Sequence, residues 1–165
     1  MIVKPYELNK IKGDLKFFLF YGKNEGLKNQ HIQQLLEKND NNNIVKYDEK
    51  EILENEDIFF ESILSNSLFE NEKSIVINRT SDKIYETVIN LIERNINGIK
   101  IIINANVLEK KSKLRKLFER EKDLACIATY PDTNEILSGL AIAFFRKIKI
   151  SISQQNINLI VDKCG

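Results

Sequence analysis

The chain has 165 residues, of which 42% are hydrophobic and 30% are charged, and this is the balance of a folded domain rather than of a disordered segment. With 25 Lys and Arg against 24 Asp and Glu, the net charge of +1 excludes a protein that coats DNA through an overall basic field. Two cysteines, Cys126 and Cys164, are too few for a disulfide-stapled secreted domain, and no stretch has the roughly 18 to 20 apolar residues of a membrane span. We therefore expect a cytoplasmic protein.

Apolar runs and amphipathic stripes alternate along the first 130 residues. Short, nearly continuous apolar runs predict five strands, at 16–21, 44–47, 73–78, 99–103 and 124–128. The segments between them have the apolar spacing of helices, at 26–38, 58–66, 83–95 and 111–120. Because parallel neighbours need helical crossovers, the alternation predicts an α/β fold in which a parallel five-stranded sheet is flanked by helices.

Spacing and capping signals set expectations for individual helix residues. Leu27, His31 and Leu35 recur at i, i+4 and i+8 and predict the buried stripe of the first helix, which makes His31 a packed residue rather than a ligand or a base. Asp82 is placed to cap the helix at 83–95. The acidic run at 48–61 is expected to be a solvated surface.

The pattern changes after Pro131, where no further strand is predicted. Two helices are expected there, at 135–146 and 152–161. The second helix leaves Ile157, Ile160 and Val161 little to pack against. We therefore expect a first domain at 1–138 and, at 139–165, the truncated beginning of a second, helical domain.

The turn after the first predicted strand is the candidate for a phosphate-binding loop. Such a loop reads G-x-x-x-x-G-K-[ST], because its glycines let backbone N–H groups surround phosphates and its hydroxyl holds Mg²⁺. Aligned on Gly22 and Lys23, this chain has Phe17 in place of the first glycine and Asn24 in place of Ser or Thr. The strand at 99–103 also runs into neutral residues where a metal-binding acid is expected. The sequence therefore argues against ATP hydrolysis and implies no cofactor.

The sequence offers few other residues of the types that carry out catalysis. Cys126 lies in the middle of a predicted strand and is expected to be a small buried side chain, and His31 is the one histidine. The spacings CxxC and HExxH do not occur in the sequence, and neither does a metal-spaced cluster. We assign no catalytic residue and no metal site, and we expect that the chain is not an enzyme by itself.

A pair of large apolar residues, Leu68 and Phe69, stands in the polar connection between the predicted helix at 58–66 and the strand at 73–78. If both side chains were exposed, each would lose the roughly 1.5 to 3 kcal/mol of stabilisation that burial of a large apolar side chain provides. Two interpretations stay open on this ground alone. Either the pair closes the helix under the sheet, or it is an anchor for a pocket on another protein.

Three stretches of the sequence carry a likeness to a known family. They read FFLFYGKNE (17–25), SLFE (67–70) followed by KSIVI (73–77), and LEKKSKLRK (108–116). Together they resemble the delta subunit of the bacterial DNA polymerase III clamp loader, over essentially the whole chain. The resemblance implies a degenerate AAA+ module with a RecA-like P-loop fold that binds no ATP.

The resemblance also implies partners. Members of the family use the apolar pair to engage a hydrophobic pocket on the beta sliding clamp and to hold the ring open, so clamp binding falls on Leu68 and Phe69. Members are longer and join the other clamp-loader subunits through a C-terminal collar. The chain is therefore expected to be a clamp-binding fragment or a shortened protein of DNA replication. Because two apolar anchors alone do not hold a ring open, we expect additional surface beside them to fit the open clamp, and the helix at 55–66 is our candidate since it is rigid and adjoins the pair.

A basic segment follows the fourth predicted strand. Residues 110–122 hold seven Lys and Arg against two Glu. The interpretation that we favour is a solvated helix in a Lys-rich chain, and the other is a patch that binds DNA weakly. The candidate DNA-facing residues are Lys110, Lys111, Lys113 and Arg115.

One function of a different class stays open as the alternative. It is a P-loop-like nucleotide-binding enzyme with an atypical phosphate loop. Nucleotide would then raise the thermal stability of the chain, because a ligand that binds only the folded state stabilises it.

Overall fold

A computed structural model describes residues 1–3, 15–37, 43–66 and 73–164. The chain divides into two compact units, Met1–Thr129 and Tyr130–Gly165. The division into domains at 1–138 and 139–165 stays a prediction.

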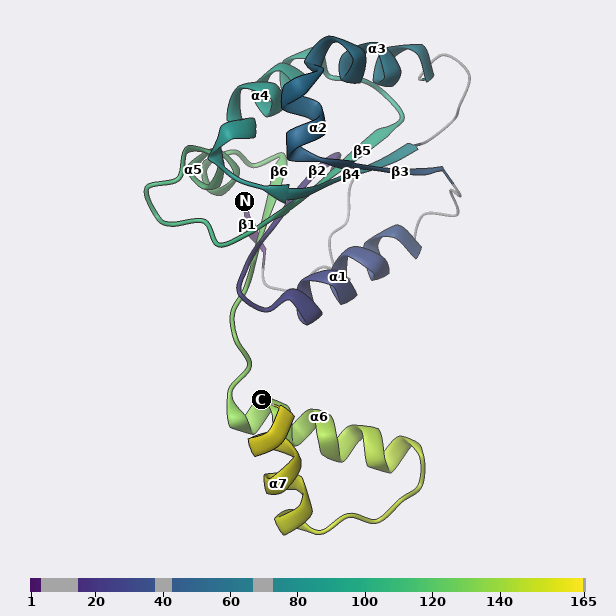
Figure 1. Cartoon of the computed structure of the whole chain (residues 1–165), viewed down its shortest axis with the longest axis vertical. Helices are drawn as coiled ribbons and strands as arrows, with labels where there is room; N and C mark the ends of the chain where they lie inside the picture. The colour runs from purple at the N-terminus through teal and green to yellow at the C-terminus, as the bar shows by residue number, and fades with distance from the viewer. Residues whose placement is uncertain (4–14, 38–42, 67–72, 165) are drawn as a thin grey trace. The chain divides into compact units, whose positions relative to one another are not determined.

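The first unit is built on one parallel sheet (Figure 1). Its strands are β1 (Ile2–Val3), β2 (Phe17–Gly22), β3 (Ile44–Asp48), β4 (Lys73–Thr80), β5 (Ile99–Ala105) and β6 (Leu124–Thr129). They lie in the order β1-β6-β2-β5-β4-β3, and every neighbouring pair is parallel. The predicted α/β class and the parallel sheet are confirmed.

The sheet has six strands, so the prediction of five was wrong. The additional strand is β1, in which Ile2 pairs with Cys126 and Val3 with Ile127 of β6. Two residues are too few to show the periodicity by which a strand is recognised in a sequence. β1 therefore forms an edge of the sheet that the sequence alone did not indicate.

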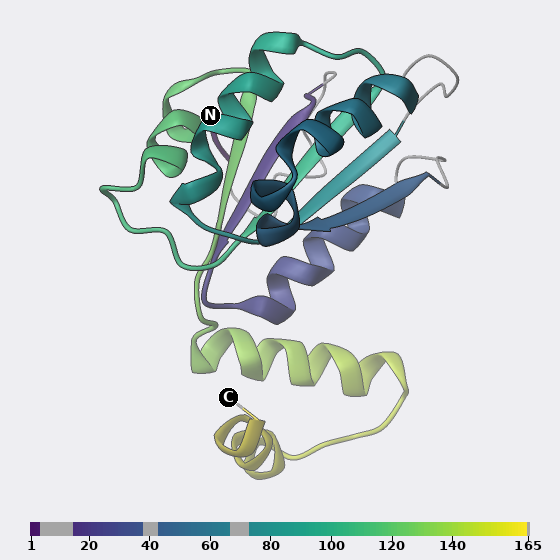
Figure 2. The same cartoon turned by 45° about the horizontal axis from the view of Figure 1, so that its top comes forward.

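Helices cover both faces of this sheet (Figures 1 and 2). One face carries α1 (Glu25–Glu37). The other face carries α2 (Glu49–Glu54), α3 (Glu56–Asn66), α4 (Tyr85–Arg94) and α5 (Lys113–Arg120). The short 3-10 helix η2 (Asp82–Ile84) leads into α4. α2 was not predicted, because its six residues are mostly charged and too few for an apolar stripe.

Alternation along β2 divides the core between the two faces. Phe17, Leu19 and Tyr21 belong to the cluster under α2 to α5, whereas Phe18 and Phe20 belong to the cluster under α1. All five side chains are buried, which confirms the prediction of a strand covered on both sides. Each such side chain contributes roughly 1.5 to 3 kcal/mol through burial. β2 is thus fixed at the centre of the unit.

The buried side of α1 is rotated by one residue from the predicted stripe. Lys28 and Ile32 are buried, whereas Leu27, His31 and Leu35 are only partly covered. A lysine can bury its methylene stem while its ammonium group reaches polar acceptors. A pattern built from apolar residues does not count such a lysine, and this is why the predicted stripe was displaced.

The second unit is a pair of helices, α6 (Asn134–Lys147) and α7 (Gln154–Cys164), that pack against each other. Ile157 and Val161 are buried, so the expectation that they have little to pack against was wrong. Among the described residues of the whole chain, no helix is both long enough and apolar enough to cross a membrane.

Candidate functional site

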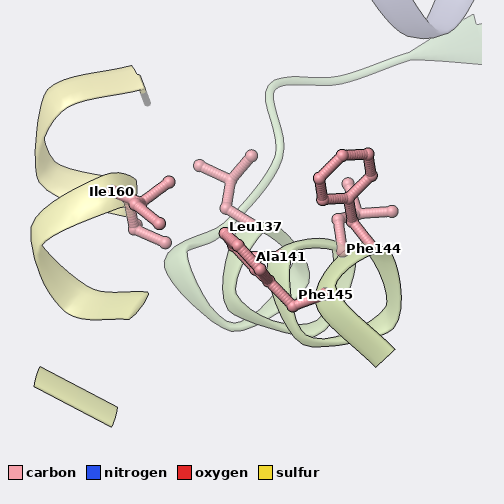
Figure 3. A pocket seen from close by; sticks show the side chains of 7 residues that line it. Leu137, Ala141, Phe144, Phe145 and Ile160 are labelled. Atoms are coloured by element: carbon pink, nitrogen blue, oxygen red, sulfur yellow. The ribbon is translucent and has the colours of Figure 1, made fainter. Parts of the chain in front are cut away.

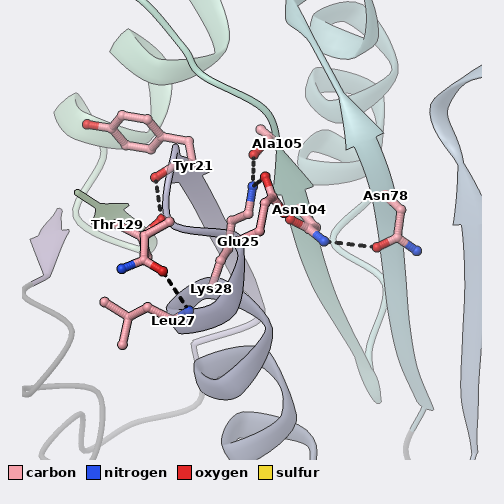
Figure 4. A network of polar contacts seen from close by, with 9 residues as sticks. Tyr21, Glu25, Leu27, Lys28, Asn78, Asn104, Ala105 and Thr129 are labelled. Carbon is pink, nitrogen blue, oxygen red and sulfur yellow. Dashed lines mark hydrogen bonds and ion pairs between the residues drawn. The ribbon is translucent and has the colours of Figure 1, made fainter. Parts of the chain in front are cut away.

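The carboxyl ends of β2 and its neighbours are the first place to look for a ligand site. β2 lies between β6 and β5, and the chain turns from its end into α1. In open α/β sheets, ligands bind outside the carboxyl ends of the strands where the strand order reverses. The turn at 22–24, which the sequence singled out as the atypical phosphate loop, lies at this position (Figure 4).

The turn between β2 and α1 is closed by hydrogen bonds to the chain itself. The Gly22 N–H donates to the Asn106 carbonyl at 3.3 Å, and the Asn24 N–H donates to the Thr129 carbonyl at 3.4 Å. Gly22 has φ +134°, and a Cβ atom there would lie 2.0 Å from the Thr129 carbonyl oxygen. Two N–H groups of this turn, those of Gly22 and Asn24, are therefore bound to protein carbonyls rather than directed at a ligand.

Lys28 fills the space beside this turn. Its side chain is only 1% exposed, and its Nζ lies 2.7 Å from the Ala105 carbonyl oxygen and 2.7 Å from a carboxylate oxygen of Glu25 (Figure 4). Lys28 was not among the residues predicted to form a site. The available signal was its position four residues before Ile32, on the same face of the helix.

Neutral side chains stand at the ends of the next two strands. The Asn104 amide of β5 donates to the Asn78 side-chain oxygen of β4 at 3.1 Å (Figure 4). Mg²⁺ in nucleotide sites is held through carboxylates, and the amides offer none. Among the described residues, no group of three or more His, Cys, Asp or Glu side chains is placed to hold a metal ion. Of the acids described at this edge, Glu25 is paired with Lys28 and Asp48 with Arg79, and the acids are not grouped to hold a metal ion.

Leu68 and Phe69 lie in the segment 67–72, outside the described residues. The elements on both sides of it are described. α3 ends at Asn66, and β4 begins at Lys73. On α3, Phe59, Phe60 and Ile63 are buried against the core, while Ile58 and Leu64 are exposed. The predicted second clamp-facing helix thus presents apolar side chains to solvent.

The four candidate DNA-facing residues differ in their surroundings. Lys110, Lys111 and Lys113 are exposed, and Lys111 is paired with Glu109 at 3.0 Å. The guanidinium of Arg115, in contrast, lies over the Tyr21 ring, 4.9 Å from its centroid.

Arg115 is bound to the protein at two further points. Its Nε donates to Glu119 at 2.8 Å, and one of its terminal nitrogens donates to the Leu108 carbonyl at 3.2 Å. Arg115 therefore fixes α5 against the end of β2, and the outward positive charge of this segment comes from its lysines and from Arg120.

Asp82 caps a different helix from the one predicted. Its carboxylate accepts hydrogen bonds from the Ser112 hydroxyl at 2.5 Å and from the Lys113 and Leu114 N–H groups at 3.1 Å each, all at the start of α5. The cap of η2 is Ser81 instead. Loss of water acts to raise the pKa of Asp82, but the bonds from Ser112, Leu114 and Lys113 outweigh it and hold that pKa below its usual range.

The two remaining candidates for chemistry lie apart from this edge. Cys126 is buried in β6, as predicted, and burial raises its pKa to about 12, so its thiol stays protonated and unreactive. His31 is half-buried in α1, and its Nδ1 lies 3.3 Å from the side-chain oxygen of Gln34. Neither residue is part of a catalytic arrangement with the groups described here.

An apolar groove of about 370 Å³ lies between the two helices of the second unit (Figure 3). Its lining consists of Leu137, Leu140, Ala141, Phe144, Phe145, Ile160 and Val161. None of these side chains can bind a metal, transfer a proton or act as a nucleophile. The groove is suited to packing rather than to chemistry.

Comparison with known proteins assigns a family. The family model described as "DNA polymerase III, delta subunit" matches residues 18–129, which span the sheet from β2 to β6. None of the curated proteins matches the sequence.

Two solved structures share the fold. Domain III of the replication initiation protein DnaA from Thermotoga maritima aligns with 15% identity and a TM-score of 0.50, over 95% of this chain and 72% of that one. RIF2 from Saccharomyces cerevisiae aligns with 12% identity and a TM-score of 0.54, over 96% and 67%. At these identities the likeness concerns the fold alone, and together with the strand order it confirms the predicted parallel α/β arrangement.

Proposed function

Because the chain belongs to the family of DNA polymerase III delta subunits, we propose that it is a non-catalytic clamp-loader component that binds the beta sliding clamp and helps to open it for loading during DNA replication. The observation that carries the proposal is the family match over 18–129, which includes the connection that holds Leu68 and Phe69. Such a role belongs in the bacterial cytoplasm.

The closed turn supports a role without ATP hydrolysis. The N–H groups of Gly22 and Asn24 donate to the Asn106 and Thr129 carbonyls. The ammonium group of Lys28 is bonded to Ala105 and Glu25. A nucleotide would have to break several of these bonds before its phosphates reached the N–H groups. The residues described at this edge therefore support a non-catalytic role over the alternative of a nucleotide-binding enzyme.

Clamp binding is assigned to Leu68 and Phe69. Two apolar anchors that become buried in a pocket contribute roughly 3 to 6 kcal/mol before the cost of association. Moving a ring from 1% to 99% open requires about 5.5 kcal/mol of differential affinity for the open form. The pair can hold the chain on the clamp, but opening requires additional surface that fits only the open ring.

The outer face of α3 is the proposed additional surface. It adjoins the segment 67–72, and it exposes Ile58 by 65% and Leu64 by 41%. Phe59 and Ile63 on its inner face are buried in the core. This packing keeps the helix in place when a partner binds its outer face.

Contacts beyond the clamp form a smaller part of the proposal. The other clamp-loader subunits are its partners, as the family implies. Weak contact with DNA is assigned to Lys110, Lys111 and Lys113, whereas Arg115 is left out because its guanidinium is bound to Glu119 and Leu108. Weak binding of primed DNA that falls as salt is raised, and that falls further in the triple Lys→Ala variant, supports this contact. Binding that the triple variant leaves unchanged contradicts it.

Surface plasmon resonance with the cognate clamp tests the proposal. Wild-type chain is expected to bind, and the Leu68→Ala/Phe69→Ala variant is expected to lose binding while its unfolding curve stays the same. Val107→Ala is the control, because Val107 is 55% exposed in the same unit and belongs to the connection between β5 and α5 rather than to α3 or the segment 67–72. A wild-type chain that does not bind, or a double variant that binds normally, contradicts the proposed function.

A further inference from the structure

A side chain at the end of α4 contacts α3. The guanidinium of Arg94, the last residue of α4, lies over the Phe60 ring of α3 at 4.4 Å from its centroid. The Phe60 side chain is 7% exposed, so Arg94 covers the ring at the surface of the unit. A guanidinium over an aromatic face is attracted by the ring electrons, and the contact therefore restrains α3 as well as covering it.

Arg94 is itself presented from a fixed point. The next residue, Asn95, ends the helix in the left-handed conformation at φ 41°, with its N–H bound to the Ile92 carbonyl at 3.1 Å. Lys16 then holds the turn, because its Nζ donates to the side-chain oxygens of Asn95 at 3.0 Å and of Asn97 at 3.1 Å. The base of the Arg94 side chain is therefore tied to the start of β2.

A second contact restrains α3 from the sheet. The Tyr47 hydroxyl of β3 lies 3.0 Å from the Ser62 Oγ, and Ser62 donates its own proton to the Phe59 carbonyl at 2.7 Å. Tyr47 is therefore the donor in the first bond. Its ring also meets the Phe59 ring edge to face, with centroids 5.1 Å apart. α3 is thus held at adjacent residues from β3 and from α4.

We propose that Arg94 and Tyr47 are positioning residues for clamp binding, because together they fix the rotation and tilt of α3 and so the direction of its exposed face. This inference rests on the proposed function. A helix that is already held in its binding orientation loses little conformational entropy when it binds. A helix that also adopts other orientations binds more weakly, because only the fraction of molecules in the binding orientation can bind. Removing either contact lowers clamp affinity without removing a clamp contact.

A double-mutant cycle on clamp affinity tests Arg94. Arg94→Ala is expected to weaken binding about twofold to fivefold, the range that corresponds to one exposed cation–π contact. Phe60→Leu keeps an apolar side chain against the core but removes the ring, and Phe60 itself is too buried to reach the clamp. If Arg94 acts through this ring, Arg94→Ala has no further effect in the Phe60→Leu background.

Three further variants complete the test. Arg94→Lys keeps a cation near the ring and is expected to restore most of the affinity. Arg120→Ala is the matched control, because Arg120 also ends its helix, is exposed, and is paired only locally, with Glu121 at 2.8 Å. Tyr47→Phe removes the hydroxyl that holds Ser62 and is expected to weaken binding, which keeps the test available if Phe60→Leu does not fold.

The outcomes separate the two proposals. Arg94→Ala and Tyr47→Phe proteins that are folded by urea titration and bind like wild type overturn the positioning role and leave the proposed function standing. A full Arg94→Ala effect that persists in the Phe60→Leu background shows direct contact with the clamp and also overturns it, as does an equal effect of Arg120→Ala. A wild-type chain that does not bind the clamp overturns the proposed function itself.

Discussion

The ammonium group of Lys28 donates a hydrogen bond to the main-chain carbonyl of Ala105, with 2.7 Å between Nζ and the oxygen. The bond joins the first turns of α1 to the last residue of β5, at the edge of the sheet where open α/β proteins bind ligands. A cation from the chain itself therefore occupies this edge. The bond is structural, and it ties α1 to the end of β5.

Replacing Lys28 with Ala is expected to destabilise the first unit by about 2 to 4 kcal/mol, because the buried stem leaves a cavity and the Ala105 carbonyl loses its partner. Urea unfolding followed by circular dichroism measures the change. Lys50→Ala serves as the control, since the Lys50 side chain is 84% exposed and its pairing with Glu54 at 3.7 Å is a surface contact worth less than about 1 kcal/mol. Equal stability of the two variants contradicts the structural role of Lys28.

Gly22→Ala is expected to destabilise the protein by at least about 2 kcal/mol, since the new methyl group meets the Thr129 carbonyl and the left-handed φ strains the backbone. Gly26→Ala provides the comparison. Gly26 lies in α1, where a Cβ would meet only the Asn24 side chain at 3.8 Å. Alanine at this position is expected to raise the free energy of unfolding by about 0.5 to 1 kcal/mol, because it favours the helix more than glycine does. If both glycines tolerate alanine equally, the turn does not have the closed geometry described.

Asp82 gives a prediction for acid pH. Because its pKa is lower in the folded state than in the unfolded one, its contribution to stability is complete above the unfolded value of about 3.9 and is lost as pH falls through the folded value. At neutral pH, Asp82→Ala is expected to cost about 1 kcal/mol, as for the loss of a helix cap. Urea titrations at a series of pH values should show this difference shrinking below about pH 4. A difference that stays constant with pH is the contrary result.

Nucleotide is expected to leave the melting temperature unchanged. A ligand present at a hundred times its Kd adds about 2.7 kcal/mol to the free energy of unfolding, so thermal melting with millimolar ATP and Mg²⁺ detects even weak binding. The hydrogen bonds of Gly22 and Asn24 are the reason to expect none. A clear rise in melting temperature contradicts the non-catalytic assignment and revives the nucleotide-binding alternative.

The features that the sequence predicted correctly are those set by local apolar patterning. The run at 17–21 predicts a strand covered on both faces, because a strand with one face in water would alternate apolar and polar residues. The same reasoning finds β3 to β6 and the helices α1 and α3 to α7 within a few residues. The strand β1 was not predicted, since two residues are too few to show an apolar pattern.

The features that were missed depend on partners distant in the sequence. Asp82 is a good cap by residue type, but its choice of α5 is decided by Ser112, thirty residues away. The sequence predicts Arg115 as a surface cation, because its contact with the Tyr21 ring joins residues that are far apart in the chain. Leu68 and Phe69 came from the sequence, and their role stays a prediction because they lie outside the described residues.

Site-specific photocrosslinking tests the central claim most directly. A benzophenone amino acid placed at Phe69 is expected to crosslink the chain to the beta sliding clamp, because the account puts that side chain in a pocket of the clamp. The same group placed at Val107, which is exposed elsewhere in the first unit, is expected to give no crosslink. A clamp crosslink at position 107 and none at position 69 would contradict the account.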